Sequence, residues 1–371
     1  MRLLILDQNY PHLENLMGDV FVHVRAKEYA KRHEVKVFSY FQEPSEIVYE
    51  GISLQRFDNV DALAAAVKEY KADKILIHFY QPWMLEKIIR QVNVPVIIWV
   101  HLFEAIGWYR RLFNYTLYSP VFFRFVLKNI RQQYRFRQLI NYANRTSRIR
   151  FVFVSDWIRR TAEKDTLTKI KAFDVIPNPV DISLFAYRPK NDEQRKKVLV
   201  LRSFDSRKYA NDVYVKGLLL LSKKKAFQDF TFTIIGKGPL FEKTLAPLRL
   251  FKNIEITNGA VRQVLIPALH EQYGVFLCPT RQDSHGVSMC EAMASGLVPI
   301  ASNNSAIPEY VEHNKSGYLT NNSAQQIAGA LEELLEKPDK FLQMSKSAAE
   351  KVRERCNIEN ISKKELAIIE S

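Results

Sequence analysis

The chain has 371 residues, of which 47% are hydrophobic, 12% aromatic and 25% charged. This composition is typical of a globular protein and excludes disordered, collagen-like and coiled-coil proteins, while the length predicts two domains because it exceeds what one hydrophobic core usually supports. The 54 Lys and Arg outnumber the 40 Asp and Glu and give a net charge of +14, which indicates an anionic partner: a nucleic acid, a phosphorylated substrate or an acidic membrane surface.

The cysteines Cys278, Cys290 and Cys356 include no Cys-x-x-Cys pair. We therefore expect neither a disulfide framework nor a zinc site, and a reducing, cytoplasmic location. The apolar run Leu3–Leu6 ends at Asp7, so it is too short for a signal-peptide core, and no run reaches the ~20 apolar residues of a membrane-spanning helix. Any membrane attachment is expected to be peripheral.

Short, continuous apolar runs alternate with helical patterns along the whole chain, as in parallel sheets whose strands are buried on both faces. In the first half we predict strands at Arg2–Leu6, Glu34–Phe38, Lys74–His78, Val94–Val100, Arg150–Val154 and Phe173–Ile176. In the second half we predict strands at Lys197–Leu201, Phe230–Ile235, Asn253–Ile256, Val275–Cys278 and Val298–Ala301, with helices at Tyr214–Lys225 and Ala324–Glu336. This alternation predicts two doubly wound α/β domains.

The boundary between these domains is expected near residue 186. Proline and polar residues at 178–181 are followed by a charged stretch from Arg188 to Lys197, a composition typical of a segment with few core contacts.

One segment, Ala105–Arg150, departs from the alternation because it is basic and aromatic and contains no acidic residue. Its basic residues are Arg110, Arg111, Arg124, Lys128, Arg131, Arg135, Arg137, Arg145, Arg148 and Arg150. Such a segment suits a membrane surface or a lipid-linked acceptor, where rings lie at headgroup depth. Two alternatives stay open: the aromatic residues pack into the core and the arginines face solvent, or the basic residues line a groove for a soluble acceptor.

A second informative segment, Tyr273–Leu319, predicts a strand, a polar loop over Pro279–Gly286, a helix at about Ser288–Ser295 and a further strand. In a doubly wound sheet, the loop after a strand's carboxyl end lies at the ligand site, and the next helix directs its free N–H groups toward it. A diphosphate group would suit this position. Asp283 in the loop and Glu291 in the helix add two carboxylates.

The run from Asp283 to Glu291, continued to Gly296 and Pro299 and followed by Pro308-Glu309 and Gly317, resembles the carboxylate-x7-Glu signature of the retaining nucleotide-sugar glycosyltransferases of family four, the glycosyl transferases group 1. Other family landmarks follow in the right order: Gly18, His23, His101, Ser155, the run 176–181 and the run 236–239. The resemblance covers nearly the whole chain. It implies the GT-B fold, in which two Rossmann-like α/β domains face each other across a cleft.

The resemblance also implies an organisation and an activity. Residues 1–185 would form an acceptor-binding domain, residues 186–354 a donor-binding domain, and residues 355–371 a helix that returns to the first domain. The enzyme would transfer a sugar from a nucleotide-diphosphate sugar to a glycan or lipid-linked acceptor with retention of configuration, in bacterial surface polysaccharide assembly. It would need no metal or other cofactor and would bind no nucleic acid.

Roles in the donor site follow from the same resemblance. Glu291 would accept hydrogen bonds from the ribose hydroxyls and Asp283 from the donor sugar, and Arg202 and Lys208 would hold the diphosphate. The candidate catalytic residues are His101 and Asp283. The other candidate donor-binding residues are Gly18, Gly236, His285, Gly286 and Val287, and the candidate acceptor or membrane residues are Arg110, Arg111, Arg131 and Arg135.

Each assignment has a structural alternative. Ser288 and Glu291 fit a helix capping box, and Asp283 fits a turn. His285 could lie in a surface loop, and Arg207 competes with Lys208. The remaining alternatives are a solvated basic loop around residue 202, a tight turn at Gly236 and a structural histidine at 101.

The function of the whole protein also has an alternative interpretation: a non-catalytic nucleotide-sugar or glycan binder on the same scaffold. A nucleic-acid binder is disfavoured because no recognition motif is present.

Overall fold

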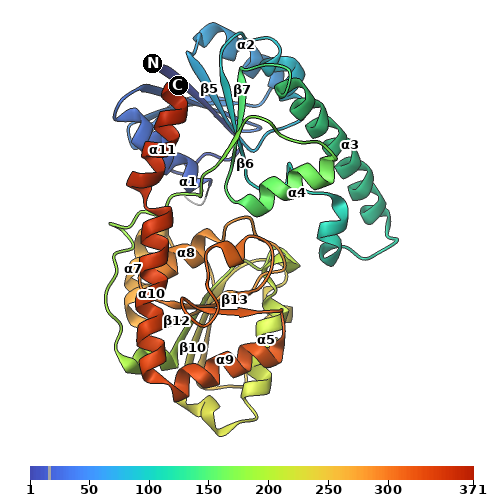
Figure 1. Cartoon of the computed structure of the whole chain (residues 1–371). Coiled ribbons are helices and arrows are strands. Elements are labelled where there is room, and N and C mark those ends of the chain that lie inside the picture. The colour runs from blue at the N-terminus through green and yellow to red at the C-terminus, as the bar shows by residue number, and fades with distance from the viewer. Residues whose placement is uncertain (16–17) are drawn as a thin grey trace. The chain divides into compact units, whose positions relative to one another are not determined.

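The computed structural model describes residues 1–15 and 18–371. The chain divides into two compact units, coloured along the chain in Figure 1. Unit 1 comprises Met1–Pro179 together with Glu359–Ser371, and unit 2 comprises Val180–Ile358. From the sequence, we expected the domain boundaries near residues 186 and 355. In the described part of the chain, no helix combines the length and apolar character needed to span a bilayer.

Unit 1 is built on a sheet of eight described strands in the order β3-β4-β2-β1-β5-β6-β7-β8, parallel except for the pair β3–β4. Their bounds are β1 (Arg2–Asp7), β2 (Glu34–Tyr40), β3 (Ser45–Tyr49), β4 (Ile52–Phe57), β5 (Lys74–His78), β6 (Val96–Val100), β7 (Ile149–Phe153) and β8 (Phe173–Val175). The sequence prediction missed β3 and β4. They lie at one edge of the sheet, where neither has the continuous burial of β6.

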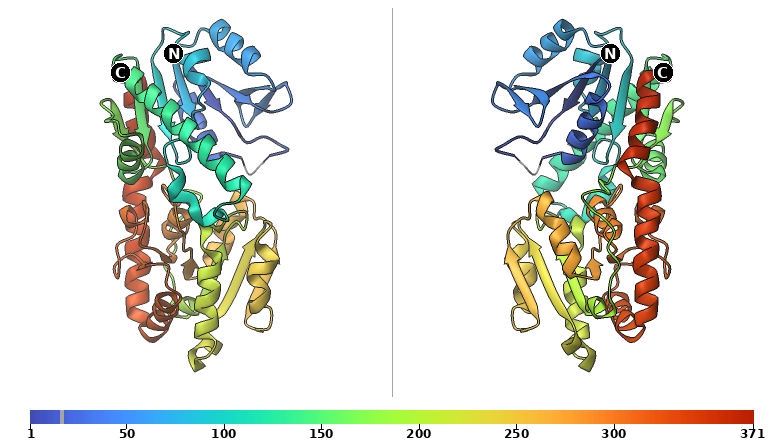
Figure 2. Two further views of the ribbon diagram at one scale, coloured as in Figure 1. Left: turned by 90° about the vertical axis from the view of Figure 1, so that its right-hand side faces the viewer. Right: turned by 90° about the vertical axis from the view of Figure 1, so that its left-hand side faces the viewer.

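The helices of unit 1 connect these strands and cover the sheet. They are α1 (Val20–Ala30), α2 (Val60–Tyr70), α3 (Pro120–Ala143), α4 (Asp156–Thr166) and α11 (Ile358–Glu370), with shorter turns η1 (Leu85–Ile89) and η2 (Trp108–Asn114). The long helix α3, seen in Figure 2, starts where Ser119 Oγ accepts a hydrogen bond from the Phe122 amide and Pro120 fixes the first helical residue.

Unit 2 contains a sheet of six described strands, all parallel, in the order β11-β10-β9-β12-β13-β14. The strands are β9 (Lys197–Leu201), β10 (Thr231–Gly236), β11 (Ile254–Asn258), β12 (Val275–Leu277), β13 (Val298–Ser302) and β14 (Tyr318–Thr320). Among the described strands of unit 2, only β14 had no predicted counterpart. It has three residues, the last of which is the polar Thr320, whereas the equally short β12 belongs to the longer apolar run Val275–Cys278.

The helices of unit 2 are α5 (Asn211–Leu221), α6 (Phe241–Leu245), α7 (Ile266–Gln272), α8 (Val287–Ala294), α9 (Ala324–Glu336) and α10 (Pro338–Cys356). Shorter turns are η3 (Asp192–Lys196), η4 (Arg207–Tyr209), η5 (Lys225–Asp229), η6 (Ala246–Leu248), η7 (Gln263–Leu265) and η8 (Ile307–Glu309). The expected helix at Ala324–Glu336 has those bounds, whereas the one expected at Tyr214–Lys225 starts and ends earlier, as α5.

Both units are doubly wound α/β domains, as predicted. The strand order reverses between β1 and β5 in unit 1 and between β9 and β12 in unit 2. In such sheets, ligands bind beyond the carboxyl ends of the strands at the point of reversal. The functional side chains of each unit are therefore expected just after these strands.

Candidate functional site

The point of reversal in unit 2 is occupied by Arg202, the residue that follows β9. Its side chain is buried, Nη2 donates to the Pro279 carbonyl oxygen (3.1 Å) just beyond β12, and Nη1 donates to Ser288 Oγ (3.4 Å) in α8. Its Nε has no hydrogen-bond partner, and no carboxylate among the described residues forms an ion pair with it. Because a buried charge without a counter-charge is costly, this position favours an anionic ligand.

A second cation, Lys208 in η4, shares an aromatic neighbour with Arg202. Lys208 Nζ lies 4.6 Å from the centre of the Tyr209 ring, and Arg202 Cζ lies 5.1 Å from it. The Lys208 carbonyl accepts hydrogen bonds from the Arg281 amide (2.7 Å) and from Thr280 Oγ1 (3.0 Å), so the loop after β12 fixes this turn. The competing Arg207 has an exposed side chain, which favours Lys208. The role of Tyr209 was not predicted.

The loop before α8 is shaped by Asp283 and Gly286. Asp283 Oδ1 accepts hydrogen bonds from the amides of His285 (3.1 Å) and Gly286 (2.9 Å), so the structure shows the turn role that the sequence left as an alternative. Gly286 has φ +78°, and a Cβ there would lie 3.0 Å from Ile307 Cδ1. The Gly286 amide is thus already engaged, whereas the first amides of α8, from Val287 on, have no intrahelical acceptor and can bind an anion.

Glu291 is buried in α8, where its Oε1 accepts a hydrogen bond from Gln263 Nε2 (2.9 Å) in η7. Burial raises the pKa of Glu291 to about 7, which the hydrogen bond from Gln263 opposes. Helix α8 begins at Val287 with Gly286 as its cap, so the capping box considered for Ser288 and Glu291 is absent. Gln263 was not predicted, because it belongs to no motif and contacts Glu291 only in the folded unit.

Gly236 ends β10 next to the backbone of Arg202. A Cβ at this position would lie 2.0 Å from the Arg202 carbonyl oxygen and 2.8 Å from the Phe204 ring. Any side chain would therefore displace the segment that carries Arg202. Gly236 thus supports the candidate donor site through close backbone packing.

His285 does not lie in a surface loop, so that alternative is wrong. Its side chain is buried, its ring meets the Tyr310 ring edge-on at 4.3 Å, and its Nε2 lies 3.7 Å from Cys356 Sγ. Tyr310 and Cys356 are themselves buried. Its expected contact with a donor stays a prediction.

In unit 1, two histidines lie at the carboxyl ends of the adjacent strands β5 and β6, next to the point of reversal. His101 follows β6 and His78 ends β5; His101 Nε2 and His78 Nδ1 are 3.1 Å apart, and both side chains are buried. Phe79 stacks on the His101 ring at 4.4 Å. Burial holds the pKa of His78 well below its ordinary value, so this ring is neutral at pH 7. His78 was not predicted as a site residue, although its place at a strand's carboxyl end was the available signal.

Carboxylates gather at the same edge of the unit 1 sheet. Glu104 is buried and accepts hydrogen bonds from the amides of His101 (2.7 Å) and Leu102 (3.1 Å), and burial raises its pKa. Burial and the charge of Glu104 raise the pKa of Asp19 to about 7. Gly18, a predicted site residue, precedes Asp19, and a Cβ on it would lie 2.4 Å from the Asn9 carbonyl oxygen. Close backbone packing explains this glycine.

Arg110 and Arg111 differ from the other predicted acceptor residues because folding engages both. Arg110 forms two hydrogen bonds with the buried Asp165 carboxylate, at 2.7 Å and 3.0 Å. The guanidinium of Arg111 lies over the rings of Phe103 (4.5 Å) and Phe125 (5.2 Å), and burial lowers its pKa. Both arginines therefore have a structural role in the segment before α3.

Helix α3 divides the aromatic and basic segment into separate faces. Its buried face includes Phe122 and Phe136, which pack in the unit 1 core. A second face is an exposed apolar stripe, spaced four, three and four residues apart: Phe123, Leu127, Ile130 and Tyr134. One residue further along lies an exposed basic stripe with the same spacing: Arg124, Lys128, Arg131 and Arg135.

The basic stripe borders a cavity of about 570 Å³ that also includes Gln81 and Pro82, just beyond β5. Arg131 and Arg135 thus contribute to a concave, basic surface. The stripe and this cavity are the structural features of unit 1 that match the predicted acceptor or membrane residues.

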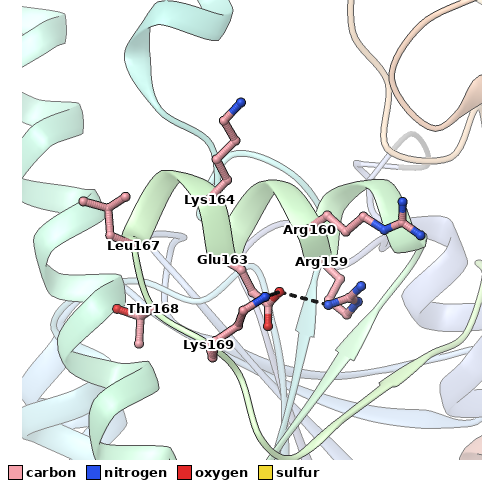
Figure 3. A pocket seen from close by; sticks show the side chains of 7 residues that line it. All are labelled: Arg159, Arg160, Glu163, Lys164, Leu167, Thr168 and Lys169. Atoms are coloured by element: carbon pink, nitrogen blue, oxygen red, sulfur yellow. Dashed lines mark hydrogen bonds and ion pairs between the residues drawn. The ribbon is translucent and has the colours of Figure 1, made fainter.

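Another hollow of about 600 Å³ lies along α4 and is also basic, as Figure 3 shows. Glu163 accepts hydrogen bonds from Arg159 Nη1 (3.0 Å) and from Lys169 Nζ (3.2 Å), and Arg160 pairs with Asp156. Three of the four basic side chains that line this hollow are therefore paired with carboxylates, whereas Arg202 is buried and none of the described carboxylates forms an ion pair with it.

Comparison with known proteins identifies related chains. Residues 185–352 match the family described as Glycosyl transferases group 1. A GDP-mannose-dependent alpha-(1-6)-phosphatidylinositol monomannoside mannosyltransferase of Mycobacterium tuberculosis is 31% identical over 143 residues, which are 35% of this chain and 37% of the relative. The chain therefore aligns with little more than a third of that curated relative.

Two solved structures resemble the chain over its full length. Sucrose-phosphate synthase from Thermosynechococcus elongatus has a TM-score of 0.78 at 14% identity and covers 100% of this chain and 98% of its own. Anabaena Alr3699/HepE, solved in complex with UDP and glucose, has a TM-score of 0.73 at 18% identity and covers 100% of both chains. At these identities the likeness establishes the fold of the two α/β units.

Proposed function

We propose that this chain, which carries a domain of the glycosyl transferases group 1 family at residues 185–352 and has the GT-B fold, is a retaining glycosyltransferase that uses a nucleotide-diphosphate sugar. Unit 2 would bind the donor and unit 1 the acceptor, a glycan or a lipid-linked glycan. The reaction would take part in the assembly of surface polysaccharide or glycolipid, and it would take place on the cytoplasmic side of a membrane.

The observation that carries this proposal is the buried Arg202, whose charge no described carboxylate neutralises. Lys208 shares the Tyr209 ring with it, and Ser288, one of its partners, lies in the first turn of α8. Two cations and a helix N-terminus that converge on one place suit a diphosphate. The UDP complex of the HepE structure agrees with such a ligand for this fold.

A mechanism follows from these groups. Departure of the nucleoside diphosphate leaves negative charge on the diphosphate, and Arg202, Lys208 and the first amides of α8 would stabilise this charge. Glu291, when ionised, would accept hydrogen bonds from the ribose hydroxyls. Asp283 uses Oδ1 to hold the loop, so it would direct Oδ2 to the donor sugar. These carboxylates act as binding groups and not as the acid–base pair of a glycosidase.

The acceptor side of the proposal rests on unit 1. His101 would lie beside the acceptor hydroxyl, held by the stacked Phe79 ring and by the Glu104 carboxylate on its amide. The two stripes of α3 would bind an anionic membrane or the diphosphate of a lipid-linked acceptor. The lipid substrate in the name of the mycobacterial relative supports a lipid acceptor.

Titration of the purified protein with free UDP, GDP, dTDP and ADP tests the donor site. Arg202→Met should weaken binding of the preferred nucleotide roughly 10- to 100-fold, since a charge-assisted hydrogen bond contributes about 1.5–3 kcal/mol. Arg207→Met, a matched control at an exposed arginine, should bind as the wild type does. Should Arg202→Met fail to fold, Lys208→Met serves instead. Equal affinity in the folded variants and the wild type would refute the diphosphate site.

The same protein, incubated with the corresponding nucleotide sugars, distinguishes the enzyme from a non-catalytic binder. An enzyme releases nucleoside diphosphate in the presence of an acceptor extract, whereas a binder does not. Product configuration, read by nuclear magnetic resonance at the anomeric carbon, tests retention.

A further inference from the structure

One imidazole and two thiols cluster inside unit 2, at the loop before α8 and the helix itself. His285 lies in that loop, Cys290 in α8 and Cys356 at the last residue of α10. All three side chains are buried, and their ligand atoms lie within 4.8 Å of one another. The cluster therefore joins segments that are 66 residues apart in sequence, from position 290 to position 356.

The spacing of these atoms matches that of ligands around one metal ion. Tetrahedral zinc with Zn–S of ~2.3 Å and Zn–N of ~2.0 Å requires about 3.6 Å between nitrogen and sulfur and about 3.8 Å between two sulfurs. His285 Nε2 lies 3.7 Å from Cys356 Sγ. The sulfur atoms of Cys290 and Cys356 lie within 4.8 Å of each other. An ion could thus bind with only small side-chain movements.

The surroundings leave the imidazole available as a ligand. Nδ1 of His285 has no hydrogen-bond partner, and the recorded contact of Nε2 is the long one to Cys356 sulfur. The Tyr310 ring meets the imidazole edge-on at 4.3 Å and fixes its position. A buried polar ring usually has a strong hydrogen bond. A metal ion on Nε2 would replace the long contact with the Cys356 sulfur by a strong bond and would leave Nδ1 outside the coordination.

We propose that His285, Cys290 and Cys356 bind one ion of the zinc class, with the fourth position taken by a ligand from outside the protein. Two thiolates and an imidazole are the donor set that such soft or borderline ions prefer. The bound ion connects the loop of Asp283 and the start of α8 to the end of α10. Its role is structural, and it does not depend on the proposed glycosyl transfer.

The test is metal binding by the full chain, purified with a reductant and without chelator. We expect one zinc per chain by elemental analysis. After exchange, Co²⁺ should produce a thiolate charge-transfer band and the visible bands of a tetrahedral site. Cys290→Ser and Cys356→Ser should bind zinc at least ~10-fold more weakly, because each removes a ligand. Cys278→Ser, at a cysteine that is buried but outside the cluster, should bind as the wild type does.

Variants that fail to fold do not prevent a decision, because the cobalt spectrum and X-ray absorption of the wild-type protein report sulfur and nitrogen ligands directly. A wild type that binds zinc only at background level, and Co²⁺ without a thiolate band, would overturn the proposal. So would a Cys290–Cys356 disulfide in the protein as isolated, read from its intact mass. Loss of binding in Cys278→Ser as well as in the cluster variants would also count against this site.

Discussion

The charge of Glu291 couples stability to ligand binding. Burial raises its pKa from the ordinary 4.5 to about 7. Between these two values the folded state holds a proton that the unfolded state has released, so stability falls as pH rises through this window. The difference corresponds to a penalty of about 3 kcal/mol above pH 7. The same ionised form is the one that can accept hydrogen bonds from a ribose.

Replacement of Glu291 by Gln should therefore separate the two effects. The variant should melt at a higher temperature than the wild type at pH 8 and at nearly the same temperature at pH 5, since glutamine carries no charge to be buried. Thermal unfolding across this range measures the difference. A variant that is less stable than the wild type at pH 8 would show that the carboxylate makes stronger interactions than its one bond with Gln263.

Nucleotide affinity should change in the opposite direction. As pH rises from 6 to 8, the affinity of the wild type for a nucleoside diphosphate should increase more than that of Glu291→Gln, because only the wild type gains a ribose acceptor. Ionisation of the phosphate is common to both proteins and cancels in the comparison. Calorimetric titration measures the nucleotide affinity of both proteins at each pH. Parallel pH profiles would show that Glu291 does not bind the ribose.

Single residues also show how far the sequence could lead. Arg202 and Glu291 were predicted as donor-site residues because a family motif and the ends of strands mark them. Gln263 and Tyr209 could not be predicted, because they contact Glu291 and Arg202 only through tertiary packing. The surface-loop alternative for His285 was wrong for a related reason. Its position in a polar loop suggested solvent exposure, whereas the ring is buried and contacts Cys356 at the end of α10, 71 residues away in sequence.

Among the elements, the buried parallel strands were predicted well and the marginal strands were not. A central strand such as β6 is buried along its whole length and is a continuous apolar run in the sequence. Strand β3 alternates between exposed and half-buried residues at an edge, and β14 has three residues. Edge position and short length weaken the apolar signal of β3 and β14, although the short edge strand β8 was predicted from Phe173–Ile176.

From the two exposed stripes of helix α3, we predict that the protein binds to anionic membranes. Its apolar stripe at Phe123, Leu127, Ile130 and Tyr134 is exposed, next to the basic stripe. Apolar side chains can enter the headgroup region while each basic residue near anionic lipid contributes ~1 kcal/mol. We expect the protein to float with vesicles that contain anionic lipid, to float less with neutral vesicles, and to be released by salt.

Two variants and a charge-matched control test this surface. Arg131→Glu with Arg135→Glu, and Leu127→Ser with Ile130→Ser, should each reduce flotation several-fold. Lys225→Glu with Lys252→Glu changes the net charge equally at exposed sites in unit 2 and should float like the wild type. If the control floats as little as the α3 variants, the attraction depends on net charge alone. If the wild type does not float with anionic vesicles, the basic stripe is better explained as a groove for a soluble acceptor.

At the level of the whole chain, unit 1 is completed by residues that follow unit 2 in sequence. Glu365 of α11 is buried, with Oε1 accepting from Arg25 Nε (2.8 Å) and Trp99 Nε1 (3.2 Å) and Oε2 accepting from the Tyr29 hydroxyl (2.6 Å). The helix lies beside α1 (Figure 1). Sequence alone could suggest such a return only through family resemblance, because no local pattern reveals which core a terminal helix completes.

Truncation after Asn357 should therefore destabilise unit 1 and leave unit 2 largely folded. The change removes Ile361 and Ile369, both fully buried and worth about 1.5–3 kcal/mol each, and leaves Arg25 buried without its carboxylate, a defect of about 3–5 kcal/mol. The truncated chain should bind a dye specific for exposed apolar surface and should lose hydrogen-exchange protection in β1 and β6. Its nucleotide affinity should stay within about twofold of the wild type, because Arg202, Lys208 and Glu291 belong to unit 2. Full protection of β1 and β6 after truncation would show that α11 is an accessory to the unit 1 core, whereas equal loss of protection in both units would show that they fold as one cooperative body.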